Sequence, residues 1–283
     1  MTMAFMMSFG FGVLLVLVLD RMDNAVRSAD EAEELSGLPM LAVIPVHRGD
    51  TANTPKELAD NPRSPLADAI RSLRVTLDLG EGEGKARVIM VTSSMPKEGK
   101  TFASLCLATM LSRVEARVLL IDGDLHRPKL HAAFGVTGET GLAQVLAGQA
   151  SIEDVLIRNA ADGLDFMPAG LLSKVADLVN EPQVEALLHS LAQYYDRIVV
   201  DLPPVLAVAD PRIFSRFADR VLYLIKWNST PRDAVRNGLK LLGDANVTVH
   251  GVVLSQVDQK KYSRYAYGDY GNYYGRYKEY YQS

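Results

Sequence analysis

Cysteine is nearly absent from this chain of 283 residues, because Cys106 is the only one and no disulfide can form within the chain. A reducing compartment is therefore expected. The five histidines are scattered without the spacing of metal ligands, so no structural zinc site is expected. An excess of positive charge is also missing. The formal net charge of −4 argues against a general nucleic-acid-binding protein, which would normally be basic.

Charge is missing from the amino terminus too, since the first 19 residues carry no charged side chain. At about 1.5 Å per residue, this apolar run comes close to the roughly 30 Å hydrocarbon core of a bilayer. A secretory signal would have positive charge before the run and a cleavage site of small residues after it, and both are absent. We therefore expect a transmembrane helix over residues 1–20, although a buried or interfacial helix, or a chain that continues upstream, would also fit.

Arg21 and Arg27 follow the apolar run, which favours a cytoplasmic location for the rest of the chain and an anchor in the inner (cytoplasmic) membrane. Residues 21–65 are predicted to form a juxtamembrane segment and linker. This segment begins with a short charged helix and a brief strand, and residues 47–65 are polar and contain three prolines. We expect these last residues to have no core of their own.

In residues 66–79, apolar side chains recur at helical spacing and predict a first helix. From there to residue 259, apolar β-branched runs alternate with amphipathic stretches. Strands are expected at 87–93, 116–122, 196–201, 219–227 and 250–257, and further helices at 101–113, 175–195 and 231–242. This alternation predicts one α/β domain, a doubly wound and mostly parallel sheet with helices on both faces. Residues 260–283, called the tail below, are rich in tyrosine, glycine and charge, and are expected to be disordered in isolation.

The stretch "VIMVTSSMPKEGKTFASLCLATML" places Gly-Lys-Thr between a predicted strand and a predicted helix, which is the setting of a phosphate-binding loop. Backbone N–H groups of the loop and the helix start would surround phosphates, with Lys100 neutralising charge and Thr101 offering a hydroxyl to Mg²⁺. The usual first glycine of such a loop is Ser94 here. An ordinary strand-to-helix turn is the alternative. The residues expected to bind the nucleotide are Ser94, Pro96, Glu98, Gly99, Lys100, Thr101 and Phe102.

Three aspartates end predicted strands: Asp122 and Asp124 in "VLLIDGDLHRP" and Asp201 in "RIVVDLPP". Ligands of open α/β sheets bind at the carboxyl ends of the strands, where the phosphate loop must also lie. Each aspartate alone could be a helix cap. Together with the loop they predict a Mg²⁺ site in which Thr101, Asp122 and Asp201 are the candidate metal ligands, because Mg²⁺ prefers carboxylate, phosphate and water oxygens.

The order of these motifs, followed by a terminal tyrosine cluster, resembles the bacterial tyrosine kinases of polysaccharide biosynthesis, from about Leu14 to the end of the chain. The resemblance implies an ATP- and Mg²⁺-dependent, membrane-associated P-loop enzyme that phosphorylates its own tyrosines and regulates exopolysaccharide or capsule assembly. It implies Lys100, Asp122, Asp124 and Asp201 as catalytic residues. It also implies a homo-oligomer, with a ring favoured, and as partners a polysaccharide co-polymerase or export machinery and a cognate tyrosine phosphatase.

Two further positions bear on this resemblance. Met95 replaces the extra loop lysine of the related partition ATPases, which favours the kinases. The helix "DAIRSLR" is similar to the family's oligomerisation motif through Asp68, Arg71 and Arg74, with aspartate in place of glutamate. A charged helix face exposed to solvent is the alternative interpretation of these three residues.

The tail offers a phenol every few residues, which suits a flexible substrate. A tyrosine has a pKa of about 10 and must lose its proton during transfer, and Asp122 or Asp124 could accept it. We expect phosphorylation in trans between neighbours of an oligomer. The candidate phosphoacceptors are Tyr262, Tyr265, Tyr267, Tyr270, Tyr273, Tyr274, Tyr277, Tyr280 and Tyr281.

Three other interpretations remain at this point. A partition-type ATPase would hydrolyse ATP to switch its dimer state and would need no tyrosine acceptor. A membrane-anchored scaffold would bind ATP without useful chemistry and organise polysaccharide export by contact alone. The tail itself could be an aromatic, low-complexity sticker that is never phosphorylated.

Overall fold

The computed structural model describes residues 24–78, 87–171 and 178–262. Eight strands form one sheet in the order β1-β8-β7-β2-β6-β3-β5-β4. The strands are β1 (Met40–Pro45), β2 (Val88–Ser93), β3 (Val118–Asp122), β4 (Ile157–Ala161), β5 (Leu164–Met167), β6 (Arg197–Asp201), β7 (Arg220–Lys226) and β8 (Gly251–Val257). All neighbours pair in parallel except β4 and β5, which are antiparallel.

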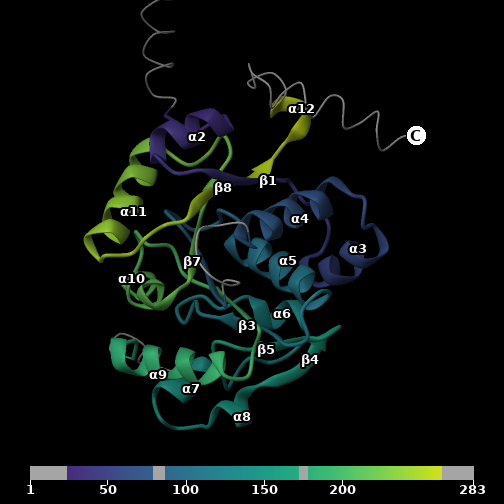
Figure 1. Ribbon diagram of the computed structural model, residues 1–283, viewed down its shortest axis with the longest axis vertical. Coiled ribbons are helices and arrows are strands. Elements are labelled where there is room, and N and C mark those ends of the chain that lie inside the picture. The colour runs from purple at the N-terminus through teal and green to yellow at the C-terminus, as the bar shows by residue number, and fades with distance from the viewer. Residues whose placement is uncertain (1–23, 79–86, 172–177, 263–283) are drawn as a thin grey trace, which may run out of the picture.

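Helices cover both faces of the sheet (Figure 1). The helices are α2 (Ala29–Ser36), α3 (Thr54–Asp60), α4 (Pro65–Asp78), α5 (Lys100–Ser112), α6 (Leu130–Ala133), α7 (Leu142–Leu146), α8 (Ile152–Val155), α9 (Glu181–Ala192), α10 (Asp210–Phe214), α11 (Arg232–Asp244) and α12 (Gln259–Tyr262). Helices α4 and α5 lie on one face, whereas α9, α10 and α11 lie on the other. The expected α/β architecture with a mostly parallel sheet is confirmed.

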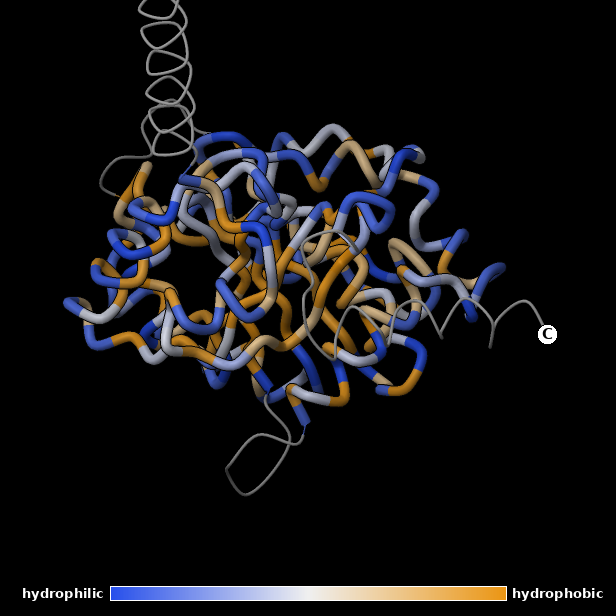
Figure 2. The backbone as a smooth tube through the Cα atoms, turned by 90° about the horizontal axis from the view of Figure 1, so that it is seen from above, coloured by the Kyte–Doolittle hydropathy of each residue, from blue (hydrophilic) through white to orange (hydrophobic). Residues whose placement is uncertain are grey.

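The central strands are buried on both faces, which explains why their sequences are continuous apolar runs rather than alternating patterns. Every residue of β2, β3 and β6 is buried. Figure 2 shows this as an orange interior surrounded by segments in which blue and orange alternate. All five predicted strands and the helix from 101 to 113 are confirmed within one or two residues at each end.

Two predicted helices have different limits in the structure. Helix α9 begins at Glu181 rather than at 175, because the Asn180 side chain accepts a hydrogen bond from the Gln183 N–H and so caps the helix. Residues 172–177 lie outside the described part of the chain. Helix α11 continues to Asp244, two residues beyond the predicted end.

Residues 47–65 are not a linker without a core, and this prediction is wrong. They contain α3, whose Leu58 is 1% exposed and belongs to the hydrophobic cluster under α4 and α5. Arg113, at the end of α5, donates hydrogen bonds to the carbonyl oxygens of Leu58 (2.8 Å) and Pro55 (3.1 Å). Proline and polar residues dominate the sequence here, so one buried leucine gave too weak a pattern to be recognised.

Residues 24–46, predicted as part of a juxtamembrane segment, also belong to the folded unit. Strand β1 pairs in parallel with β8, and α2 packs against α11 on the face of the sheet that α11 covers. The predicted division between residues 65 and 66 therefore falls inside the folded unit rather than at its edge. Among the described residues, no helix is long and apolar enough to cross a membrane. The transmembrane helix predicted at 1–20 lies outside them.

Candidate nucleotide-binding site

The three strands that carry the predicted motifs are adjacent, in the order β2, β6, β3. Asp201, at the end of β6, is in register with Val91 of β2 on one side and with Asp122 of β3 on the other. The strands are parallel, so the loop after β2 and the two carboxylates lie at one edge of the sheet. The topology thus brings together the phosphate loop and the aspartates that the sequence predicted for one site.

The phosphate loop runs from Ser93 to Gly99 and has the left-handed backbone at Lys97 (φ 68°) and Gly99 (φ 89°). Ser94 does not have a positive φ, so a side chain is tolerated at the position where a glycine is usual. Its buried hydroxyl lies 2.7 Å from the hydroxyl of Tyr223 on β7. The departure from the usual glycine spacing is therefore accommodated by the backbone.

A glycine in α11 makes room for this contact. A Cβ at Gly238 would lie 1.9 Å from the Tyr223 hydroxyl, closer than any real contact. Gly238 therefore lets Tyr223 reach Ser94 beneath the loop. Sequence reasoning missed both residues, since a tyrosine in an apolar strand and a glycine in a helix give no sign of a shared role.

Two loop residues predicted to bind nucleotide have contrasting positions. Pro96 is exposed at the tip of the loop, with Met95 and Lys97. Glu98 is 2% exposed, and its side chain turns into the protein, where it accepts a hydrogen bond from the Met95 N–H at 2.6 Å and another from the Thr230 hydroxyl. The Glu98 carboxylate therefore supports the loop from within.

Lys100 begins α5 and is 7% exposed. Burial lowers the pKa of Lys100, while the negative charges of Asp201, Glu98 and Asp124 act in the opposite direction. The ammonium group thus lies among carboxylates in a partly desolvated site, where a charge interacts more strongly than it does in water. This position suits a lysine that neutralises phosphate charge.

Asp201 is 2% exposed and accepts hydrogen bonds from the hydroxyls of Ser104 (3.2 Å) and Thr101. Burial raises the pKa of Asp201 to about 6, opposed by the charge of Lys100 and by these hydroxyls. The hydroxyl of Thr101 and the carboxylate of Asp201 are oxygen donors in contact with each other. This donor set fits Mg²⁺, which binds a few protein oxygens and otherwise phosphates and water.

Asp122 is fully buried, and its carboxylate accepts three backbone hydrogen bonds, from the N–H groups of Asp124 (3.3 Å), Lys129 (3.1 Å) and Leu130 (3.0 Å). Burial raises the pKa of Asp122 to about 8, the nearby Asp201 adds to this, and the three N–H groups oppose it. Both carboxylate oxygens already hold the backbone that leads into α6. Asp122 therefore shapes the site, and direct contact with a metal or a substrate would compete with these bonds.

Asp124 has a different environment, because it is only partly buried and accepts a hydrogen bond from the Arg127 N–H at 2.9 Å.

A histidine and an aspartate form a polar contact close to Asp124: His126 Nε2 is 3.1 Å from Asp210 Oδ2. Burial raises the pKa of Asp210, and the charge of His126 opposes this. Sequence reasoning missed Asp210, although an aspartate soon after the "DLPP" stretch was a usable signal.

A cavity of about 170 Å³ adjoins the start of α5. Phe102 lines it and stacks on His47, with ring centroids 4.9 Å apart. Gly99, the ends of β1 and β8, and the segment that follows β1 also line this cavity. This aromatic-walled space beside the phosphate loop could hold a flat ring. Thr230, in the loop after β7, donates its hydroxyl proton to the Glu98 carboxylate on the other side of the phosphate loop.

Tyr262 is placed differently from the exposed phenol that was predicted. It is 5% exposed in α12, its hydroxyl accepts a hydrogen bond from the Ala29 N–H at 3.1 Å, and its ring packs edge-on against Trp227. In this conformation Tyr262 is a core residue and cannot act as an acceptor. The other eight candidate tyrosines lie outside the described residues.

The three predicted oligomerisation residues share helix α4. Arg71 forms an ion pair with Asp68 and donates a hydrogen bond to the carbonyl of Pro62 at 2.7 Å. The Nε of Arg74 is buried and has no hydrogen-bond partner in the described part of the chain. Asp68 and Arg71 therefore stabilise the start of α4 through contacts within this chain.

The fold and this site define a P-loop nucleotide-binding protein. A family model described as an AAA domain matches residues 86–237, more than half of the chain. EpsB of Ralstonia solanacearum, named as a tyrosine-protein kinase, is 34% identical over 94% of this chain, and the tyrosine-protein kinase etk of Escherichia coli K12 is 28% identical over 94%. The chain belongs to this AAA-domain family and, within it, to the bacterial tyrosine kinases.

The solved structures agree with this assignment. The kinase domain of the Escherichia coli tyrosine kinase ETK has a TM-score of 0.76 and 30% identity, over 82% of this chain and 95% of that domain. The chain spans only 36% and 39% of the lengths of EpsB and etk.

Proposed function

We propose that the chain is an ATP-dependent protein tyrosine autokinase that phosphorylates its own tail in trans, within a membrane-associated oligomer that regulates exopolysaccharide or capsule assembly. The observation that carries the proposal is the convergence of Lys100, Thr101, Asp201 and Asp124 at one edge of the sheet. The names of the relatives support tyrosine as the acceptor. The rest of the proposal is argued from the residues of this chain.

The phosphates of ATP would bind the N–H groups of the phosphate loop and the start of α5, with Lys100 beside them. The base would enter the cavity next to Phe102. Thr101 and Asp201 would hold Mg²⁺, which would supply positive charge to neutralise the phosphates. The protein's main contribution is then alignment and neutralisation of charge, which phosphoryl transfer requires.

In the transfer step, the phenol oxygen of a tail tyrosine forms a bond to the γ-phosphorus, while the bond from that phosphorus to the β,γ-bridging oxygen breaks and ADP leaves. The phenol proton passes to a carboxylate. We assign this role to Asp124, because its carboxylate is partly exposed and has one backbone partner. Asp122 positions the loop that carries Asp124, since both of its oxygens are engaged by backbone N–H groups.

Oligomerisation through α4 would bring the tail of one subunit to the site of its neighbour at high effective concentration. Each phosphate adds about −1.5 to −2 charges at neutral pH, so several on one tail would repel one another and loosen the assembly. Native mass measurement of phosphorylated and dephosphorylated protein tests this step. An unchanged oligomer would count against it.

One experiment tests the central proposal. The 283-residue chain is incubated with Mg-ATP, and phosphotyrosine and released phosphate are measured for wild type, Lys100→Met and a chain that ends at Tyr262, which keeps the buried part of the tail. Phosphotyrosine that disappears in both variants is the expected result. Released phosphate without phosphotyrosine would instead support a partition-type ATPase, and neither product would support a scaffold.

A further inference from the structure

The phosphate loop contains a carboxylate that does not face the nucleotide site. The two oxygens of Glu98 have separate partners: Oε2 accepts from the Met95 N–H at 2.6 Å, and Oε1 accepts from the Thr230 hydroxyl. A buried carboxylate is unfavourable unless hydrogen bonds satisfy it, and bonds to a charged acceptor are stronger than neutral ones. The Ser93 side chain and the charge of Lys100 also stabilise this carboxylate. Glu98 therefore links several groups of the loop to Thr230 outside it.

The direction of the Thr230 bond follows from its other contact. The Thr230 hydroxyl oxygen accepts a hydrogen bond from the Lys226 N–H at 2.9 Å, so its proton is available for the Glu98 carboxylate. The backbone of Thr230 is held as well, because its N–H donates to the carbonyl of Lys226 at 3.1 Å. Thr230 is thus a fixed donor at the end of β7.

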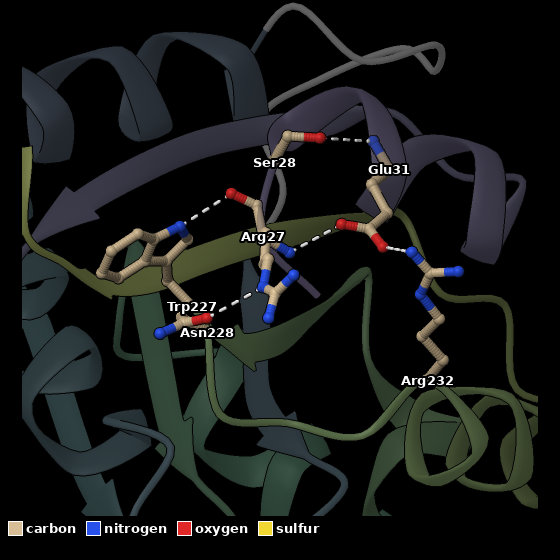
Figure 3. Close-up of polar contacts among 6 residues, drawn as sticks. All are labelled: Arg27, Ser28, Glu31, Trp227, Asn228 and Arg232. Carbon is tan, nitrogen blue, oxygen red and sulfur yellow. Dashed lines mark hydrogen bonds and ion pairs between the residues drawn. The ribbon is translucent and has the colours of Figure 1, made fainter. Parts of the chain in front are cut away.

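Residues 226–232 are held in turn by the juxtamembrane segment, as Figure 3 shows. The indole N–H of Trp227 donates to the carbonyl of Arg27 at 2.7 Å, and Arg27 Nε donates to Asn228 Oδ1 at 3.1 Å. Arg232 forms an ion pair with Glu31, whose other oxygen accepts from the Arg27 N–H at 2.7 Å. Contacts with residues 27–31 therefore hold the segment that carries Thr230 in place, independently of the phosphate loop.

Two more contacts connect the loop to the neighbouring strand β8. The Ser255 hydroxyl donates to the backbone carbonyl of Glu98 at 2.6 Å, and Gln256 Nε2 donates to the carbonyl of Lys97 at 2.9 Å. Glu98 and Lys97 lie directly before Gly99, where the chain turns into α5. The position of these residues fixes the direction of the N–H groups that would face the phosphates.

We propose that Glu98, held by Thr230, is a positioning residue that keeps the phosphate loop in the conformation that binds nucleotide. This inference rests on the proposed function, because it requires nucleotide phosphates in the loop. Glu98 acts through Met95 and the loop backbone, and it touches neither the phosphates nor the acceptor. Loss of its partner weakens phosphate binding and leaves the groups that carry out transfer in place.

The test uses the 283-residue chain with Thr230→Val, which removes the hydroxyl and keeps the branched shape, and with Glu98→Gln as an independent variant. Thr230→Ser restores the donor, and Thr248→Val, at an exposed position before β8, is the matched control. We expect the Kd for Mg-ADP and the KM for ATP to rise about tenfold in the first two variants, equivalent to about 1.4 kcal/mol. The kcat should stay within about twofold of wild type, and Thr230→Ser and Thr248→Val should match wild type in Kd and KM.

Unchanged nucleotide affinity in both Thr230→Val and Glu98→Gln would overturn the inference. So would a fall in kcat with unchanged KM, or a failure of Thr230→Ser to restore binding. Should Thr230→Val not fold, as judged by its thermal unfolding, Glu98→Gln alone decides by the same criteria. Failure of the wild-type chain to bind Mg-ADP would overturn the proposed function instead, which keeps the two outcomes distinct.

Discussion

Replacing Asp122 and Asp124 separately by alanine distinguishes their roles, because the two residues stand two positions apart in very different surroundings. Asp122→Ala removes the acceptor of three backbone N–H groups, one of which, that of Leu130, is buried. Asp124→Ala removes the acceptor of a single N–H, that of Arg127, which is exposed. We expect the first substitution to lower stability and the second to lower the transfer rate.

The magnitudes follow from these contacts. A buried N–H left without an acceptor costs about 1–3 kcal/mol, and partly exposed ones cost less because water replaces the acceptor. Removing the buried carboxylate of Asp122 also relieves its unfavourable burial beside Asp201, which offsets part of the loss. We therefore expect Asp122→Ala to reduce the free energy of unfolding by about 2 kcal/mol. For Asp124→Ala the reduction should be below about 1 kcal/mol, with a rate of tail phosphorylation about 100- to 10,000-fold lower.

Urea unfolding of the nucleotide-free chain measures stability, and single-turnover formation of phosphotyrosine at saturating Mg-ATP measures the rate. Arg127→Ala keeps the N–H that Asp124 accepts and is the matched control for local disturbance. The reasoning is refuted if Asp122→Ala is as stable as wild type. It is also refuted if Asp124→Ala phosphorylates the tail at the wild-type rate.

Three further substitutions test the packing around the site. Gly238→Ala should destabilise the protein by about 1–3 kcal/mol in thermal unfolding despite the better helix propensity of alanine, and most of this loss should vanish in a Tyr223→Phe background, where no hydroxyl lies 1.9 Å from the new methyl. Leu58→Ala should cost about 2–5 kcal/mol in urea unfolding, since this side chain is buried beneath α5. Tyr262→Phe should cost about 1 kcal/mol by removing the acceptor of the Ala29 N–H, and phosphopeptide mass spectrometry of the wild type should find Tyr262 unmodified.

Each of these has a decisive opposite result. Equal losses for Gly238→Ala in both backgrounds would mean that the Tyr223 hydroxyl is not the obstacle. A cost for Leu58→Ala no larger than that of Lys56→Ala, an exposed neighbour on α3, would restore the view of residues 47–65 as a linker. Stoichiometric phosphate on Tyr262 in the folded chain would show that α12 opens during the reaction.

The sheet and the main site were predictable because both depend on local patterns. Continuous apolar runs are required of strands covered on both faces, and the aspartates stand at the ends of such runs. Parallel pairing then places the ends of β2, β3 and β6 at one edge whatever the details of packing. Asp201 and Lys100 could accordingly be assigned to one site from the sequence alone.

Contacts between distant segments could not be predicted in this way. Thr230 and Glu98 form one hydrogen bond although they are 132 positions apart in the sequence. Neither residue lies in a local sequence pattern that would indicate the other as its partner. Tyr262 was placed with the tail because its neighbours in sequence are tyrosines, whereas its burial depends on Trp227. The folded state of residues 47–65 likewise depends on one leucine and on Arg113, which lies far along the chain.

Strand β1 has a practical consequence for anyone who shortens this chain for expression. A fragment that begins at Leu66 would remove β1 and leave β8 at the rim of the sheet, with its unpaired N–H and C=O groups open to pairing with another molecule. The same cut would take away Ala29, the hydrogen-bond donor to Tyr262. A fragment for expression should therefore begin upstream of Ala29, and shorter ones should be screened for aggregation before any loss of activity is interpreted.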